Sequence, residues 1–66
     1  MDYEILKNFL KNHVSRLEEF FQMLMKLEES KEKEEIDMEF LVYCRGGIQT
    51  CEKILGFVKD LNINEE

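Results

Sequence analysis

Proline, tryptophan and alanine are absent from this chain of 66 residues, and glycine occurs only three times. Proline and glycine are the residues that interrupt helices most strongly, and the chain is instead rich in the helix formers Glu, Lys, Leu and Met. No long apolar run is present, so we expect neither a secretory signal nor a membrane-spanning helix. Two cysteines are too few for a disulfide framework, and we expect a cytoplasmic protein with free thiols.

Positive charge is also scarce, because nine basic residues against fifteen acidic ones leave a net charge of −6. Nucleic acids and anionic membranes both attract positive surfaces, so the charge argues against either as a general partner and leaves a basic protein open. Catalytic signatures, nucleotide-binding loops and metal-ligand clusters of convincing spacing are missing as well. We therefore predict that the chain is not an enzyme and holds no cofactor.

The first half of the chain carries a heptad pattern, in which apolar residues recur at alternating steps of three and four. The pattern predicts a helix over about residues 2–29, with a seam made of Tyr3, Leu6, Leu10, His13, Leu17, Phe20, Leu24 and Leu27. Further apolar residues beside the seam widen the apolar arc to roughly 200° around the helix, which is more than one neighbouring helix covers.

A second apolar pattern follows the charged stretch at about residues 30–35 and predicts a helix over about residues 36–61, with a polar tail at 62–66. One of its two interleaved seams consists of Leu41, Cys44, Ile48, Cys51, Leu55 and Val58, and the other of Ile36, Phe40, Tyr43, Gly47, Ile54, Phe57 and Leu61. Together the two seams again span roughly 200° of the helix. This segment also requires two neighbours.

The two helical segments have nearly equal lengths of about 37 Å at 1.5 Å per residue. Matched lengths favour an antiparallel hairpin, so that residues 1–66 form a single all-α domain. The alternative is one long helix that breaks at Gly46-Gly47 and is followed by a short helix.

With the hairpin turn near residues 32–33, Phe20 and Phe21 are predicted to lie opposite the stretch from Cys44 to Gly47. Large rings against a glycine pair let two helices approach closely. The same pairing places His13 opposite Cys51 or its neighbour Glu52.

Two hairpins packed face to face would cover both wide arcs in a four-helix bundle, which is a homodimer with coiled-coil packing. A chain of this size buries little surface alone, so a partner is expected. The face predicted to bind a second copy or another protein consists of Leu6, Phe9, Leu10, Leu17, Phe20, Phe21, Leu24, Phe40, Tyr43, Gly47, Ile54, Phe57 and Leu61. In size and layout the dimer resembles the small Rop-type plasmid regulators, and this resemblance implies RNA binding through an outer helix face.

The remaining polar candidates are a thiol pair and a histidine. Cys44 and Cys51 lie seven residues apart, or roughly 10 Å along a helix, too far for a disulfide within it. We expect both to be core residues, with an intersubunit disulfide as an alternative. His13 is expected to be a seam residue that fixes register, and a site of His13 with Cys51 for zinc or thiol chemistry is the alternative.

A locally basic, amide-rich patch on the first helix suggests a nucleic-acid regulator as an alternative function. Its residues are Lys7, Asn8, Lys11, Asn12, Ser15 and Arg16. It lacks exposed aromatic rings for base stacking, and acidic residues flank it. The function that the sequence favours is a small acidic interaction module or regulator that self-associates as a helical hairpin.

Overall fold

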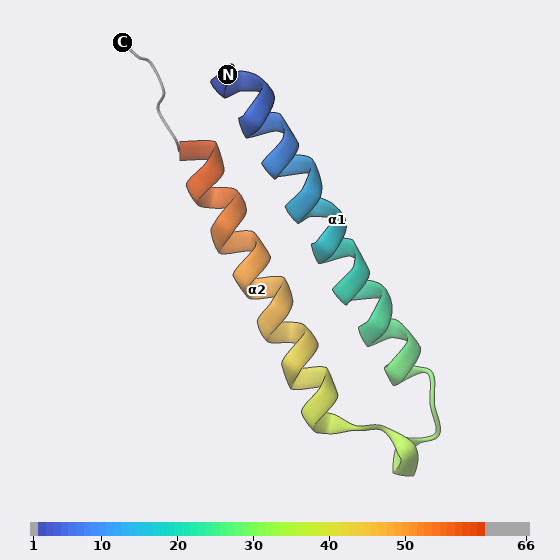
Figure 1. The fold of residues 1–66 in the computed structure, drawn as a ribbon. Coiled ribbons are helices and arrows are strands. Elements are labelled where there is room, and N and C mark those ends of the chain that lie inside the picture. The colour runs from blue at the N-terminus through green and yellow to red at the C-terminus, as the bar shows by residue number, and fades with distance from the viewer. Residues whose placement is uncertain (1, 61–66) are drawn as a thin grey trace.

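In a computed structural model the chain is an antiparallel hairpin of two long helices, α1 (Tyr3–Glu29) and α2 (Met38–Asp60), joined by a connection that contains the short 3-10 helix η1 (Lys33–Glu35) (Figure 1). The structure describes residues 2–60, so the predicted tail and Leu61 lie outside the described residues. The hairpin is confirmed. The alternative of one long helix is wrong, because the chain turns after Glu29 and α2 continues through both glycines.

Helix α1 is closed at both ends by short polar side chains. The carboxylate of Asp2 accepts a hydrogen bond from the backbone N–H of Glu4 at 2.9 Å, which makes Asp2 the N-cap. At the other end the Ser30 hydroxyl donates to the carbonyl oxygen of Leu27 at 2.7 Å. Each cap satisfies a backbone group that the helix itself leaves unpaired.

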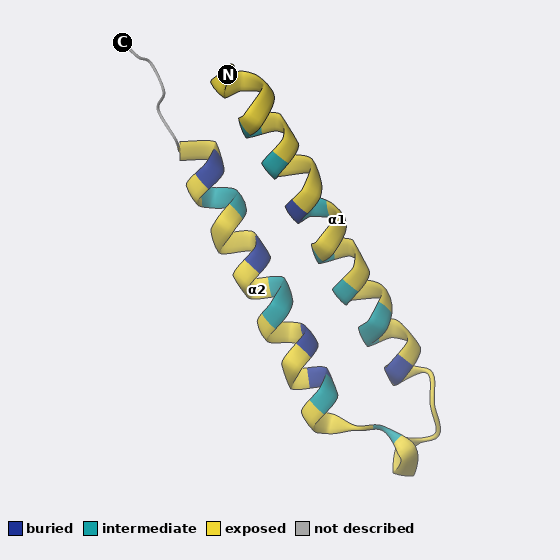
Figure 2. Cartoon of the chain, viewed as in Figure 1, coloured by how far each residue is buried: buried dark blue, intermediate teal, exposed yellow. Residues whose placement is uncertain are grey.

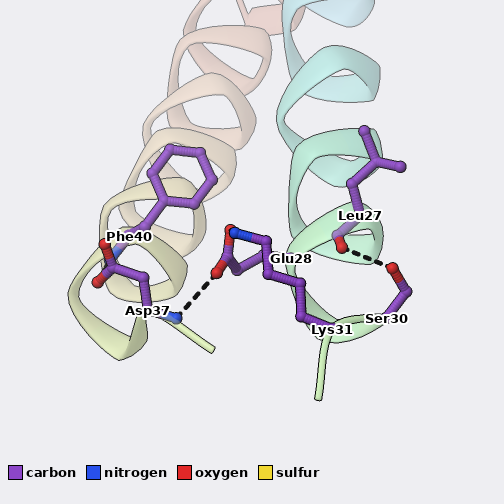
Figure 3. Close-up of polar contacts among 6 residues, drawn as sticks. All are labelled: Leu27, Glu28, Ser30, Lys31, Asp37 and Phe40. Atoms are coloured by element: carbon purple, nitrogen blue, oxygen red, sulfur yellow. Dashed lines mark hydrogen bonds and ion pairs between the residues drawn. The ribbon is translucent and has the colours of Figure 1, made fainter. Parts of the chain in front are cut away.

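The connection is held by the Glu28 carboxylate, which is buried and reaches across to the start of α2 (Figure 3). It accepts a hydrogen bond from the backbone N–H of Asp37 at 2.8 Å and lies 3.0 Å from the ammonium group of Lys31. Asp37 in turn accepts from the backbone N–H of Phe40 at 3.1 Å. One acid at the end of α1 therefore binds the cap of α2.

The capping by Asp37 changes the predicted boundary and register. Helix α2 begins at Met38 and not at residue 36, because Ile36 and Asp37 belong to the connection. The centre of the turn is therefore shifted towards the C-terminus relative to the prediction. Phe21 still lies against Gly47, as expected.

The hairpin core is narrow and made mostly of small side chains. Among residues 2–60 the buried apolar residues are Val14, Leu41, Cys44, Cys51 and Val58. Gly47 is the glycine in closest contact with the other helix, because a Cβ atom there would lie 2.7 Å from the ring of Phe21. Since real Cβ atoms do not approach neighbours so closely, any side chain at this position would have to displace the ring.

We predict that Gly47→Ala destabilises the hairpin although alanine favours helices by about 1 kcal/mol over glycine. Overpacking typically costs about 1–3 kcal/mol, so the net change should be a loss. Gly56→Ala is the matched control, because nothing lies within 4 Å of its Cβ position, and it should stabilise the protein by up to about 1 kcal/mol. Urea denaturation of both variants measures the difference, and equal stabilisation by the two would contradict the packing at Gly47.

Glu28 gives a second prediction, which concerns pH. The hydrogen bond from the Asp37 backbone and then the Lys31 ammonium group lower the pKa of Glu28 below its ordinary value of 4.5. A carboxylate with a lowered pKa stabilises the fold above its unfolded pKa, and this stabilisation is lost as the pH falls through the folded pKa.

At pH 7 we expect Glu28→Gln to lower the melting temperature by roughly 5 °C, because an amide oxygen accepts the bond from the Asp37 backbone more weakly than a carboxylate does and forms no ion pair with Lys31. The gap between the wild-type protein and Glu28→Gln should begin to close near pH 4.5, where the carboxyl group of the unfolded chain takes up its proton, and should close further as the pH falls through the lower folded pKa of Glu28. Thermal melts at fixed protein concentration from pH 7 to pH 3 measure it. A gap that stays constant to pH 3 would show that the Glu28 charge does not hold the turn.

Candidate functional site

The residues of α1 that pack on α2 are not those of the predicted heptad seam, although that seam contains more large apolar side chains. Val14 and Glu28 are buried, and Lys7 and Phe21 on the same row are half-buried. The predicted seam lies one residue earlier on the helix, or about 100° around it. On this seam Leu10 and Leu24 are half-buried, and the other members are exposed, namely Tyr3, Leu6, His13, Leu17, Phe20 and Leu27.

In helix α2, one of the two predicted seams also faces the other helix and the second is largely exposed. The first seam faces α1, because all its members are buried or half-buried: Leu41, Cys44, Ile48, Cys51, Leu55 and Val58. On the second seam Tyr43, Ile54 and Phe57 are exposed, and the Phe57 side chain is 72% exposed. Figure 2 shows the buried positions of both helices turned towards each other, with exposed positions around them.

The exposed rows of the two helices lie on the same side of the hairpin. We call the residues that face the other helix the inner row of each helix. In α1 the exposed row lies one position before the inner row and consists of Leu6, His13, Phe20 and Leu27. In α2 the exposed row again lies one position before inner residues, with Tyr43, Thr50 and Phe57 preceding Cys44, Cys51 and Val58. A twofold axis perpendicular to the plane of two antiparallel helices exchanges the helices and leaves each side of the pair on the same side. Because both exposed rows are displaced from their inner rows by the same single position, both lie on the same side of the hairpin.

A chain of aromatic rings crosses this side from α1 to α2. The ring centroids of Phe20 and Phe21 are 6.4 Å apart, those of Phe21 and Tyr43 are 5.9 Å apart, and those of Tyr43 and Phe40 are 6.3 Å apart. These spacings lie in the range in which aromatic pairs attract each other. The rings therefore join the exposed rows of the two helices into one continuous surface.

We call this surface the apolar face. It consists of Tyr3, Leu6, Leu10, Leu17, Phe20, Leu24 and Leu27 from α1 and Tyr43, Ile54 and Phe57 from α2, with His13 and Thr50 as its polar members. The opposite side is mostly polar. The residues that follow the inner rows by one position are Asn8, Ser15, Gln22, Glu29, Arg45, Glu52 and Lys59, with the exposed Met38 at the start of the α2 row. The exposed Ile5, Met23 and Val42 point away from the partner helix and lie outside the apolar face. The hairpin as a whole is therefore amphipathic.

The predicted interaction residues fall into three groups in the structure. Most of them line the apolar face. Phe9 is exposed at its edge, and Phe40 is half-buried beside Tyr43. Phe21 and Gly47 instead pack against each other inside the hairpin. Leu61 lies outside the described residues. Tyr3 and Leu27 were in the predicted seam, and their exposure adds them to the face.

His13 and the cysteines do not share a site in the described part of the chain. His13 is exposed and stacks on Phe9, with the ring centroids 6.0 Å apart and the planes at 12°. Cys44 and Cys51 are free thiols buried between the helices, at 0% and 2% exposure. Residues 2–60 contain no group of three or more side chains able to hold a metal ion.

The expected position of His13 opposite Glu52 is wrong, because Glu18 occupies that position in the shifted register and interacts with Glu52. Burial, and then the charges of Glu18 and Glu52, raise the pKa of the Cys51 thiol. A protonated, enclosed thiol is a poor nucleophile and a poor metal ligand. An intersubunit disulfide would require the hairpin to open.

The basic patch of α1 is also divided by the fold. Lys7 and Ser15 are half-buried, whereas Asn8, Lys11, Asn12 and Arg16 are exposed. A shallow recess of about 220 Å³ lies at the edge of the apolar face and is lined by Phe9, Asn12, His13 and Arg16.

Comparison of the chain with protein-family models, curated proteins and solved structures finds no match. Neither described helix has an apolar stretch long enough to cross a membrane. The apolar face is therefore the feature from which a function is inferred.

The acidic pair on the polar side gives a testable prediction. Partial burial, and then the charge and hydrogen bonding of Glu52, raise the pKa of Glu18 above its ordinary value of 4.5. A carboxyl group with a raised pKa is charged at a cost in the folded state, and the cost disappears as the pH falls through the folded pKa.

Glu18→Gln should therefore raise the melting temperature by a few degrees at pH 7, and the gain should shrink as the pH falls through the raised pKa of Glu18 towards the ordinary value of 4.5. Glu34→Gln removes the same charge from the exposed η1 turn and serves as the control. If the two variants melt alike at pH 7, Glu18 carries no particular strain.

Proposed function

We propose that this chain is a non-enzymatic interaction module that acts as a homodimer, in which the apolar faces of two hairpins meet in a four-helix bundle. The observation that supports the proposal is the matched offset of the exposed rows, which brings the apolar seams of both helices to one side and leaves the other side mostly polar. A face this rich in leucine and aromatic residues is typical of a surface that another polypeptide covers.

The small core of the hairpin also supports a dimer. Its buried apolar side chains are two valines, two cysteines and one leucine, whereas the larger Phe20 and Phe57 are 53% and 72% exposed. Fully burying a Leu or Phe side chain contributes about 1.5–3 kcal/mol. Covering the face would therefore add several kcal/mol of apolar stabilisation, and a domain of this size requires such a contribution.

The spacing of the apolar residues along both helices favours a second copy of the chain as the partner that covers the apolar face. An antiparallel α2 of another copy, in the register seen within the hairpin, brings Leu10 opposite Phe57 and Leu27 opposite Phe40. It also brings Phe20 over the stretch Gly46-Gly47, where α2 carries no side chain. The rows match along their whole length because both repeat every seven residues.

In this proposal the polar side of the bundle stays in solvent and carries the net negative charge. Free buried thiols agree with a cytoplasmic location. A different protein with an amphipathic helix is the alternative occupant. RNA binding through the divided basic patch has no specific observation in its favour.

Substitutions on the face test the proposal. Phe20→Gln with Phe57→Gln removes two large apolar side chains per copy, and we expect the dissociation constant of the dimer to rise at least 100-fold, or about 3 kcal/mol. Sedimentation equilibrium measures it, with the wild-type protein at twice the chain mass of 8.0 kDa.

Met38→Gln with Val42→Gln is the matched control. Both side chains are exposed to a similar degree, 65% and 62%, but they lie about 100° or more around α2 from Tyr43. This control should dimerise like the wild-type protein. A wild-type protein that is folded and monomeric at millimolar concentration would overturn the homodimer. If the Met38/Val42 double variant weakened the dimer as much as the Phe20/Phe57 double variant, the assignment of the dimer interface to the apolar face would be wrong.

A further inference from the structure

The apolar face carries one histidine among its apolar side chains. His13 lies on the same row as Leu6, Phe20 and Leu27, and histidine is the residue type whose ordinary protonation range lies between about pH 5 and 8. It stacks on Phe9 and makes no hydrogen bond to the described residues. Its row position means that any partner covering the face also covers the imidazole.

Among the described residues of α1, no carboxylate lies beside His13 on the apolar face. On α1, Arg16 shares its recess, whereas Glu4, Glu18 and Glu19 lie about 120–180° around the helix from it. A protonated imidazole would therefore have the Arg16 guanidinium as its charged neighbour on its own helix.

Within residues 2–60, those that meet His13 from α2 also include no acid. At its level α2 presents Ile54 and Phe57, with Lys53 at the edge of the face. Glu52 lies in the polar row, where it interacts with Glu18. The face of a second copy brings apolar residues, Thr50 and its own His13. Enclosing a charged imidazole there is costly because none of the described neighbours compensates the charge.

We propose that protonation of His13 controls assembly, so that the hairpins associate through the apolar face with neutral imidazoles and separate when the solution is acidified. This inference rests on the homodimer proposed above and adds its regulation. The direction follows from linkage: each dimer buries two neutral histidines, so dissociation takes up as many as two protons and is favoured as the pH falls.

The test is the dimer dissociation constant of the wild-type protein and of His13→Asn, measured by sedimentation equilibrium at pH 7.5 and pH 5.5. For the wild-type protein we expect an increase of at least 10-fold on acidification, with a limit of about 100-fold per pH unit for two protons. His13→Asn keeps a polar side chain that does not titrate, and its dissociation constant should change far less. His13→Leu should associate more tightly than either, with the same weak pH dependence.

The outcomes separate this inference from the proposed function. A wild-type dimer with the same affinity at both pH values, or an equal response in His13→Asn, overturns the role of His13 and leaves the dimer standing. Monomers at both pH values in all three proteins overturn the dimer itself. Circular dichroism at each pH shows whether the separated chains remain helical.

Discussion

Each helix of this chain carries apolar side chains over about twice the width that a single neighbour can cover, and the rest of the structure depends on this mismatch. Folding into a hairpin gives α1 and α2 one neighbour each. The inner rows are buried between the two helices, and the exposed rows that form the apolar face remain in solvent on one side of the hairpin. The amphipathic character therefore moves from the single helix to the whole hairpin, whose apolar side is one continuous surface.

The choice of inner row follows from close packing. Four of the five buried apolar positions of the described hairpin hold small side chains, namely Val14, Cys44, Cys51 and Val58, and Gly47 admits the ring of Phe21. Small side chains let two helices approach closely, whereas the Leu- and Phe-rich row would hold them apart. The buried Glu28 carboxylate favours the same inner row. Its hydrogen bond from the backbone N–H of Asp37 sets the residue at which α2 begins and therefore the register of α2 against α1.

The hairpin and its two apolar seams on α2 could be predicted from the sequence, because heptad spacing and matched segment lengths are local properties of the chain. The row of α1 that faces α2 could not. Phe20 and Phe21 are adjacent and equally apolar, so periodicity cannot decide which of them turns inward. The answer depends on Gly47 and on the turn. The Asp37 cap was missed, although an aspartate just before an apolar run is a recognised helix start, and this omission shifted the predicted partner of His13.

The central claim is that a second hairpin covers the apolar face, and intermolecular contacts in solution test it most directly. In a sample mixed from isotope-labelled and unlabelled chains, filtered nuclear Overhauser spectra report only contacts between copies. The account predicts such contacts to Phe20, Leu24, Tyr43 and Phe57 and none to Val42. Intermolecular contacts at Val42 and the polar rows, or none at the apolar face at millimolar concentration, would contradict it.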